Sequence, residues 1–399
     1  MFIPSKKILE NYARVMVDFA LGKGKGVKKG EVVFIQYDIE AKPLALEIFR
    51  RVLEIGAYPM TRSYDEDFEK TMFDIASNDQ LKFLPKKYTK ALVETIDHRV
   101  YLMAPKDPFL LKDIDPKKII LANQSKNFVK KLIFEKEDKG KLSWSICLYG
   151  TEGMAKEAGL SLEEFWKQII NACFLDLDEP IKKWKEVFSQ IENIRQKLNQ
   201  MPIDKIHFIS KNTDLWISLG EKRVWQGGRG ANIPSFEIFT SPDWRGTEGK
   251  VYFNFPLYRY GNLIKDIYLE FKDGKIIKAK ASSNEKLFKE MIKQKNADKI
   301  GEFSLTDKRF SRINQFMANT LYDENFGGEW GNSHIAVGSS YHDCFLGDKK
   351  KMKKKDWEKL GFNESIEHTD IINTEKKQIE TILKNGIKKV IYKDGLFMI

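Results

Sequence analysis

The sequence predicts two domains, an α/β N-terminal domain with a mostly parallel sheet and an α+β, β-rich C-terminal domain. Three observations support this prediction. The chain has 399 residues, more than one domain usually contains. Strand-like and helix-like segments alternate through the first half, which is typical of a parallel sheet. Beyond about residue 205, short apolar runs follow one another with turn signals between them.

The first half contains four strand-like runs and an amphipathic helix. The β-branched run 31–37 predicts a strand, and apolar residues at helical spacing in 41–57 predict a helix. Runs 99–104 and 118–123 predict two further strands, with prolines as punctuation beside them. Residues 143–150 predict another strand. This alternation is the basis for expecting a parallel sheet.

Two helices close the first half. The stretch "SLEE" places Ser161 three residues before Glu164, which is the pattern of a capping box at a helix start. A long charged helix follows over residues 179–200 and ends at "MP". We therefore expect the domain boundary there, with an N-terminal domain of residues 1–200 and a C-terminal domain of residues 201–399.

Short strands dominate the second half. Runs such as "KIHFIS", "DLWISLG" and "KVYFNFPLYRYG" are rich in β-branched and aromatic residues. "KDGK" at 272–275 contains the Asp-Gly dipeptide of a tight hairpin. Helices are predicted near 285–295 and 310–322. The second domain is therefore expected to be α+β with a large share of strand.

Composition favours a cytoplasmic protein that does not enter a membrane. No run of 18 uncharged apolar residues occurs, and the N-terminal stretch predicts an amphipathic helix rather than a secretion signal. Cys147, Cys173 and Cys344 are widely spaced and odd in number. They form neither a disulfide framework nor a thiolate zinc site, so a reducing cytoplasm is expected.

The net charge of +11 raises the possibility of nucleic-acid binding. Its densest source is "KKKMKKK" at 349–355. Folds that read nucleic acid usually interleave arginine and aromatic residues, whereas lysines dominate here and are spread along the chain. Blocks of like charge usually stay exposed, so we expect a solvated surface and no nucleic-acid partner.

Four segments of the second domain concentrate side chains that can bind metals. "NIPSFEIFTSP" and "DKIGEFSL" each place a glutamate among apolar neighbours, "NSHIAVGSSYHD" contains a histidine and a tyrosine seven apart, and "IEHTDI" contains His-x-Asp. Oxygen and imidazole ligands without thiolates suit zinc, cobalt or manganese. The set exceeds what one tetrahedral ion needs and would fit two ions about 3.5–4 Å apart. Its members are Glu237, Glu302, His334, Tyr341, His368 and Asp370.

Each of these residues also has a plain structural interpretation. A glutamate in an apolar run is often the exposed face of a strand, and a single histidine is more often a hydrogen-bonded structural residue than a ligand. His98 and His207 flank predicted strands and are expected to be structural. His342 follows Tyr341 directly, so on an extended segment it would point the other way.

The order of these segments resembles the aminopeptidase T family of metallo-aminopeptidases, also called the AmpS type. "PSFEIFTSP" matches that family's Pro-Gly-Gly-Glu-Val-Phe-Thr-like segment, and "IGEFSL" matches its Leu-Gly-Glu. "NTLYDEN" and "HIAVGSSY" match the next two motifs, and "EHTD" matches the closing His-x-Asp. "ENYARVMVDFALG" and "AGLSLEEFWKQIINACFLDLDEPIKKW" extend the resemblance into the first domain.

The resemblance implies a dinuclear peptidase that removes single residues from peptides with a free N-terminus. It implies a catalytic C-terminal domain, a homodimer with enclosed active sites, and two divalent ions per subunit, which could be zinc, cobalt, manganese or magnesium. The metal ligands would be the six residues named above. Glu324 is a candidate general base, although it could instead cap local backbone, and Tyr341 could be a ligand, an oxyanion stabiliser or both.

Two departures from the family pattern concern the surroundings of the site. Ser235 and Phe236 replace the usual pair of glycines, and "FGGEWG" at 326–331 is an insertion, while the lysine run lengthens the loop that follows. These changes would reshape the pocket but leave the ligands intact. Two alternatives stay open: a mononuclear metal-dependent amidohydrolase and a basic, nucleic-acid-associated binding protein.

Overall fold

The computed structural model describes residues 2–259 and 261–399, without the side chains of residues 116 and 120. The chain divides into two compact units. Unit 1 comprises residues 1–185 and 229–234, and unit 2 comprises residues 186–228 and 235–399. The division falls within the long helix α10 (Pro180–Gln200), whose end at residue 200 is the predicted domain boundary. Residues 229–234 return to unit 1 because strand β8 pairs with β4 there.

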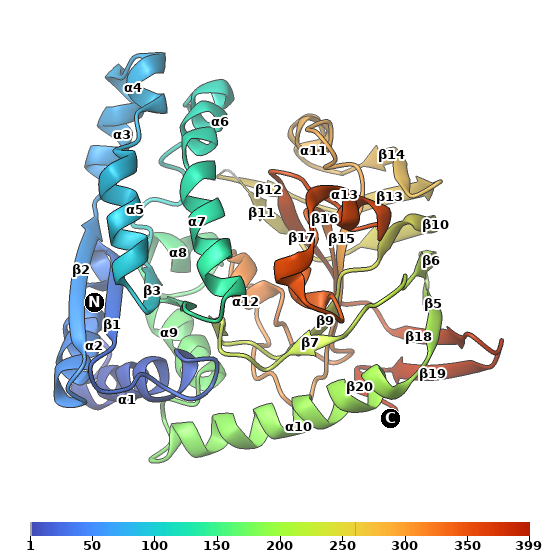
Figure 1. Cartoon of the computed structure of the whole chain (residues 1–399), viewed down its shortest axis with the longest axis horizontal. Helices are drawn as coiled ribbons and strands as arrows, with labels where there is room; N and C mark the ends of the chain where they lie inside the picture. The colour runs from blue at the N-terminus through green and yellow to red at the C-terminus, as the bar shows by residue number, and fades with distance from the viewer. Residues whose placement is uncertain (1, 260) are drawn as a thin grey trace. The chain divides into compact units, whose positions relative to one another are not determined.

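Unit 1 is built on a five-stranded sheet with the order β2-β1-β3-β4-β8. Every strand pair is parallel, which confirms the predicted parallel sheet. Figure 1 shows this sheet and the helices around it. Because the strand order reverses after β2, right-handed crossovers require α2 to lie on the opposite face from α3, α4 and α5. The strands are β1 (Val32–Asp38), β2 (Tyr58–Tyr64), β3 (His98–Met103), β4 (Ser143–Leu148) and β8 (Asn232–Ile233).

The helices of unit 1 follow the predicted alternation at most positions. Ser161 and Glu164 form the predicted capping box at the start of α9. The helices are α1 (Lys6–Val15), α2 (Lys42–Glu54), α3 (Glu66–Ile75), α4 (Asn78–Lys82), α5 (Lys86–Thr95), α6 (Pro116–Ser125), α7 (Asn127–Asp138), α8 (Glu152–Glu157) and α9 (Leu162–Ala172).

The strand predicted at 118–123 is wrong, because these residues belong to helix α6. The Asp115 side chain accepts a hydrogen bond from the Lys117 amide at 2.9 Å and caps the helix start. Proline at the next position suits the first turn, where the missing amide hydrogen would have no partner. The prediction gave too much weight to two adjacent isoleucines and too little to this start signal.

Unit 2 contains two antiparallel sheets and a two-stranded hairpin. The larger sheet has the order β14-β13-β10-β6-β5-β18-β19-β20, and the smaller has the order β17-β16-β15-β9-β7. The larger comprises β5 (Ile203–Ser210), β6 (Thr213–Ser218), β10 (Asp243–Phe253), β13 (Ile267–Lys272), β14 (Lys275–Lys280), β18 (Lys377–Leu383), β19 (Lys388–Lys393) and β20 (Leu396–Phe397). The smaller comprises β7 (Gln226–Gly227), β9 (Glu237–Thr240), β15 (Ile300–Thr306), β16 (Asn332–Gly338) and β17 (His368–Asn373). The hairpin is β11 (Leu257–Arg259) with β12 (Asn262–Ile264).

The hairpin predicted at 272–275 and the helix predicted near 285–295 agree with the structure, whereas the helix predicted at 310–322 is only partly present. Asp273 and Gly274 both adopt positive φ between β13 and β14, as a tight hairpin requires. Helix α11 (Glu285–Ile292) lies where one was predicted. Over 310–322 only α12 (Thr320–Asp323) begins, and the rest is irregular.

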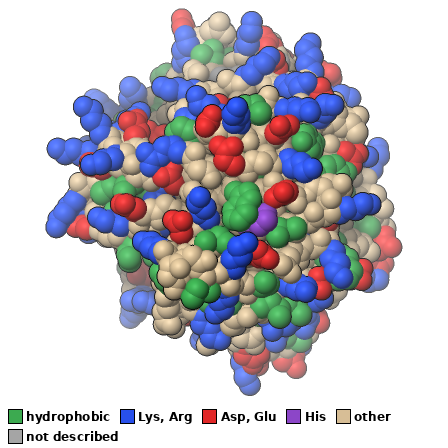
Figure 2. All heavy atoms as spheres, turned by 90° about the vertical axis from the view of Figure 1, so that its right-hand side faces the viewer, with side chains coloured by type: hydrophobic (Ala, Val, Ile, Leu, Met, Phe, Trp, Pro, Cys, Tyr) green, Lys and Arg blue, Asp and Glu red, His purple; other side chains and the backbone are tan. Residues whose placement is uncertain are grey.

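Across the described residues, no helix combines the length and apolar character needed to cross a bilayer. On the face shown in Figure 2, lysine and arginine side chains are interspersed with acidic ones rather than collected in a groove.

Candidate metal centre

The smaller sheet of unit 2 brings the predicted ligands together because of its register. Residues directly opposite each other in an antiparallel pair project to the same face, as do alternate residues of one strand. Glu237 on β9 lies opposite Thr306 on β15. Ser304 on β15 lies opposite His334 on β16. Since Glu302, Ser304 and Thr306 alternate along β15, Glu237, Glu302 and His334 occupy one face.

The next strand pair adds two more of the predicted ligands to the same face. Ala336 on β16 lies opposite both Glu302 on β15 and Asp370 on β17, and Gly338 lies opposite His368. Ala336 and Gly338, the two smallest residues of β16, therefore stand beside the bulky predicted ligands on β15 and β17. A Cβ at Gly338 would overlap a backbone carbonyl, and its φ of +106° favours glycine.

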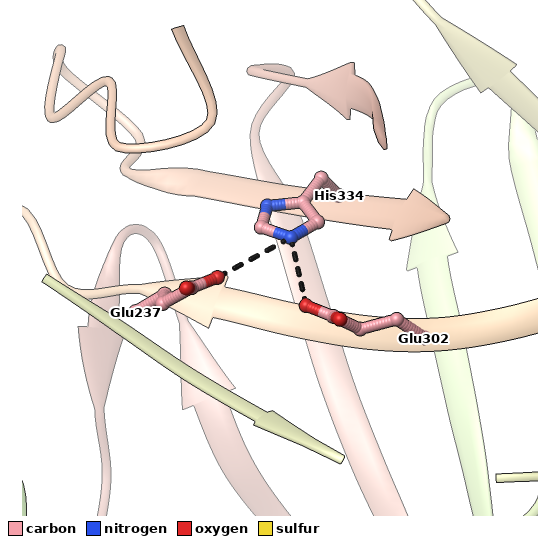
Figure 3. A group of neighbouring side chains, drawn as sticks. All are labelled: Glu237, Glu302 and His334. Atoms are coloured by element: carbon pink, nitrogen blue, oxygen red, sulfur yellow. Dashed lines mark hydrogen bonds and ion pairs between the residues drawn. The ribbon is translucent and has the colours of Figure 1, made fainter. Parts of the chain in front are cut away.

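The ligand side chains converge at contact distances. His334 Nε2 lies 3.2 Å from Glu302 Oε1, 3.4 Å from Glu237 Oε2 and 3.8 Å from Asp370 Oδ1. His368 Nε2 lies 3.4 Å from Asp370 Oδ1 and 3.7 Å from Glu302 Oε2. Glu237, Glu302 and His334 each offer a ligand atom within 4.8 Å of the others (Figure 3). The sheet thus gathers three carboxylates and two imidazoles predicted from the sequence.

The chemistry of this group fits a divalent cation. The Asp370 Oδ1 atom is buried and accepts no hydrogen bond within the described part of the chain. Three carboxylates that are buried or half-buried within a few ångströms of one another repel, and such a group needs cations or protons to persist away from water. Oxygen and imidazole ligands without a thiolate suit zinc, manganese or cobalt.

The imidazoles supply positive charge to this cluster in the metal-free protein. Burial alone would lower the pKa of His334, but Glu302, Asp370 and Glu237 together raise it to about 10. Asp370 and Glu302 likewise raise the pKa of His368 to about 9 against the effect of burial. Metal ligation requires neutral imidazoles, so metal binding should release these protons.

The pKa values of two carboxyl groups, Glu237 and Asp370, are shifted in opposite directions within this cluster. Burial, followed by the charge of Glu302, raises the pKa of Glu237 to about 7. Burial also acts to raise the pKa of Asp370, but His368 and His334 outweigh it and hold that pKa at about 2. Glu237 is therefore the carboxyl of this pair that more readily holds a proton when no metal is bound.

Two residues that the sequence analysis did not select orient the ligands. Ser304 Oγ donates a hydrogen bond to Glu237 Oε2 at 3.2 Å. His368 Nδ1 lies 2.8 Å from the Ser339 carbonyl oxygen, which directs Nε2 toward the cluster. Ser304 could have been found from the alternation in "GEFS", which places it on the face of Glu302, whereas the role of Ser339 depends on tertiary structure.

Tyr341 stands beside the cluster rather than within its group of carboxylates and imidazoles. Its ring centroid is 4.6 Å from that of His368, and the residue is 41% exposed. The Tyr341 amide donates a hydrogen bond to Ser241 Oγ at 2.8 Å, which fixes the backbone at this position. The structure thus places the phenol ring against one predicted ligand.

Glu324 approaches the cluster from the turn after α12. Asn332 Nδ2 donates hydrogen bonds to the carbonyl oxygens of Glu324 at 2.7 Å and Asp323 at 3.1 Å, which anchors the turn to β16. Burial first, and then the charges of Glu237 and Asp370, raise the pKa of Glu324 well above its usual value. Without a cation nearby, a buried carboxyl with this raised pKa favours the protonated form. Divalent cations bound at the neighbouring carboxylates would lower its pKa again, and the deprotonated carboxylate could then accept a proton.

The remaining histidines make structural contacts. His98 lies 2.7 Å from Ser143 Oγ through Nδ1 and 2.8 Å from Glu31 Oε2 through Nε2. His207 stacks on Trp216 with centroids 3.8 Å apart. His342 stacks on Trp357 at 3.9 Å with an interplanar angle of 5°.

Known proteins resemble this chain over nearly its whole length. The family described as Thermophilic metalloprotease (M29) matches residues 5–397. Aminopeptidase AmpS of Bacillus subtilis is 28% identical, with 97% of each chain covered. Aminopeptidase T of Thermus thermophilus is 25% identical, with 96% of this chain and 98% of that protein covered. The solved structure of wild-type AmpT from Thermus thermophilus has a TM-score of 0.85 at 22% identity, covering 99% of this chain and all of that one, so the fold is shared.

Proposed function

The chain belongs to the thermophilic metalloprotease (M29) family, and from this premise we propose that it is a metal-dependent aminopeptidase that removes the N-terminal residue from peptides. The observation that supports this proposal best is the single sheet face carrying Glu237, Glu302, His334, His368 and Asp370 in mutual contact. The relatives named above are themselves called aminopeptidases.

Two divalent ions per subunit are proposed for this face. The residues that would hold them are Glu237, Glu302, His334, Tyr341, His368 and Asp370. Bound zinc, cobalt, manganese or magnesium would supply the charge that acidifies a water molecule and polarises the scissile carbonyl. The number of oxygen and imidazole ligands favours two ions over one.

Glu324 is proposed as the general base. Its carboxyl would take a proton from the attacking water and return it to the departing amine of the shortened peptide. The burial of Glu324 and its anchoring through Asn332 hold the carboxyl beside the ligand face. Tyr341, whose ring contacts His368, would stabilise the negative charge that develops on the carbonyl oxygen, as a ligand or as a hydrogen-bond donor.

The carboxylate-rich face also supports recognition of a free α-amine. A protonated or metal-directed N-terminus is favoured beside Glu237, Glu302 and Asp370, whereas a blocked N-terminus loses this interaction. We further propose a homodimer that works in the cytoplasm. The three cysteines of each chain are buried free thiols, in keeping with a reducing compartment.

The test is metal removal and replacement. Chelator-treated protein should lose hydrolysis of aminoacyl fluorophores, and cobalt, zinc or manganese should restore it. Elemental analysis of active protein should find two ions per chain, since one ion would favour the mononuclear amidohydrolase. An N-terminally acetylated peptide is the matched control, and equal cleavage of blocked and free peptides would rule out an aminopeptidase.

A basic nucleic-acid-binding protein is the weaker alternative. The mixed charges on the face shown in Figure 2 do not form a basic groove there. Nucleic-acid binding depends steeply on salt, so retention on nucleic acid at physiological salt would be needed to revive this alternative.

A further inference from the structure

The loop that contains the lysine run folds into a small core of its own. We call residues 339–363 the excursion. Cys344, Phe345, Trp357 and Phe362 are buried together in it, and the half-buried side chains of Phe239, Met352 and Leu360 pack against them. Phe239 lies outside the excursion, on strand β9. The apolar side of the excursion thus meets the ligand-bearing sheet at Phe239.

Phe239 lies on the face that carries the ligands. It is two residues from Glu237 on the same strand, and it lies directly opposite Ser304. Its ring centroid is 5.9 Å from that of Tyr341, with the rings tilted by 65°, and Tyr341 in turn contacts His368. Phe239 and Tyr341 therefore form an aromatic wall along one side of the ligand group, and both rings remain partly exposed.

Several contacts fix this wall in place. The stacked rings of His342 and Trp357 hold the segment next to Tyr341. The Arg223 guanidinium lies 3.6 Å above the Phe362 ring. Lys349 forms an ion pair with Asp343 across the base of the excursion. The exposed lysines face solvent while the apolar side chains face the core, so the excursion orders an apolar surface beside the ligands.

We propose that Phe239 and Tyr341 bind the side chain of the substrate's N-terminal residue and select for apolar side chains such as leucine, methionine and phenylalanine. This inference rests on the proposed function, because an N-terminal residue whose amine and carbonyl meet the ligand group projects its side chain onto an adjacent wall. Burial against aromatic rings rewards apolar surface. Acidic side chains are disfavoured because an ionised carboxylate would lose its hydration against the two aromatic rings.

The experiment compares Phe239→Ala and Phe239→Leu with the metal-loaded wild-type enzyme. The substrates are fluorogenic amides of alanine, leucine, phenylalanine, arginine and aspartate, and the readout is the leucine-to-alanine ratio of kcat/KM. One extra methylene in an apolar pocket changes such ratios by about 10–200-fold. We therefore expect Phe239→Ala to lower the ratio about tenfold or more and Phe239→Leu to retain most of it. Metal content reports whether the ligand group stays intact.

Phe68→Ala is the matched control, because Phe68 is 80% exposed on α3 in unit 1 and its removal should leave the ratio unchanged. A ratio that stays within about twofold in Phe239→Ala would overturn the proposal. A wild-type preference for arginine or aspartate over leucine would overturn the apolar class. If metal-loaded wild type cleaves no free-amine substrate at all, the proposed function itself fails, and this result is distinct from the other two.

Discussion

Asp370 shows how strongly one side chain can depend on its neighbours. Its Oδ1 atom is buried, lies within 3.8 Å of two imidazoles and accepts no hydrogen bond in the described part of the chain. The imidazoles hold its pKa at about 2, so the group is anionic throughout the physiological range. A buried anion placed in this way is poised to bind a cation.

Replacing Asp370 with asparagine should therefore abolish activity without unfolding the protein. The substitution keeps the shape but removes the charge, and His368→Ala removes the neighbouring donor. Loss of residues that only support ligands typically costs about 10–100-fold in metal affinity or activity, so direct ligands should cost at least as much. Bound metal and kcat should both fall, while circular dichroism stays native. Wild-type metal content in either variant would show that the ligand assignment is wrong.

The choice of control for these variants follows from the structure. His342 is close to Tyr341 in sequence but stacks on Trp357, so its removal would disturb the excursion as well. His207 is the better control. It stacks on Trp216 in the larger sheet, whereas the proposed ligands lie on the smaller sheet, so His207→Ala should keep wild-type metal content.

Lys377 provides a separate prediction at the scale of one residue. It begins β18, is 2% exposed, and its Nζ lies 3.4 Å from the Trp330 carbonyl oxygen. Burial lowers the pKa of Lys377 to about 7, although Glu375 opposes the shift. The unfolded lysine keeps its proton up to about pH 10. Between these values the unfolded state binds more protons, so wild-type stability rises with pH there.

Lys377→Met should stabilise the protein most at pH 7 and below. Its advantage over wild type should then shrink by about 1.4 kcal/mol per pH unit up to about pH 10. Thermal unfolding with a chelator present, at pH 6, 8 and 10, measures this difference without interference from metal binding. Lys388→Met, at an exposed position of β19, should show no such pH dependence. A pH-independent difference for Lys377→Met would mean that this lysine stays charged in the fold.

At the scale of elements, the register of β15, β16 and β17 decides which side chains meet at the proposed metal site. Ala336 lies opposite both Glu302 and Asp370, so its small side chain leaves the space between two carboxylates open. Strands β15 and β16 are buried along their whole length, so a larger residue cannot turn away into solvent.

Ala336→Val should therefore impair metal binding more than it impairs folding. Overpacking of a well-packed core costs about 1–3 kcal/mol, while the added methyl groups would separate Glu302 from Asp370. Calorimetric titration with zinc and the melting temperature measure the two effects separately. Ala279→Val, on the edge strand β14, is the matched substitution and should change neither strongly. Zinc affinity equal to wild type in Ala336→Val would show that the ions bind elsewhere.

Helices and hairpins could be predicted from the sequence where the residues that specify them are adjacent along the chain. Ser161 with Glu164, and Asp273 with Gly274, specify a helix start and a hairpin through neighbouring atoms alone. The shared orientation of His368 and Asp370 was predictable because alternation along one strand is also local. The position of Ala336 between two ligands was not visible, because it depends on pairing between strands far apart in the sequence.

At the scale of the whole molecule, the net charge of +11 is distributed rather than concentrated. In the excursion, Lys349 pairs with Asp343, and Lys354 Nζ lies 3.1 Å from Glu364. Lys350, Lys351, Lys353 and Lys355 are exposed. These exposed charges are screened at physiological salt, where the Debye length is about 8 Å.

Replacing Lys350, Lys351, Lys353 and Lys355 with glutamine should leave turnover of a small dipeptide unchanged. Lys349 and Lys354 are kept because their ion pairs hold the excursion. Steady-state kinetics at about 0.15 M salt test this expectation. A collapse of kcat with a native melting temperature would show that these lysines act on the reaction itself.

The ligand face also has a consequence for protein synthesis. Its first carboxylate is at residue 237 and its last at residue 370, and no single strand carries more than two of the five carboxylate and imidazole ligands. At about 5–20 residues per second, the ribosome needs roughly 7–27 s to make the stretch between them. During that interval Glu237, and later Glu302, exist without His368 and Asp370. Under the proposed ligand assignment, full metal affinity would arise only when β17 joins the sheet, so metal uptake would mark a chain that has been made at least to β17.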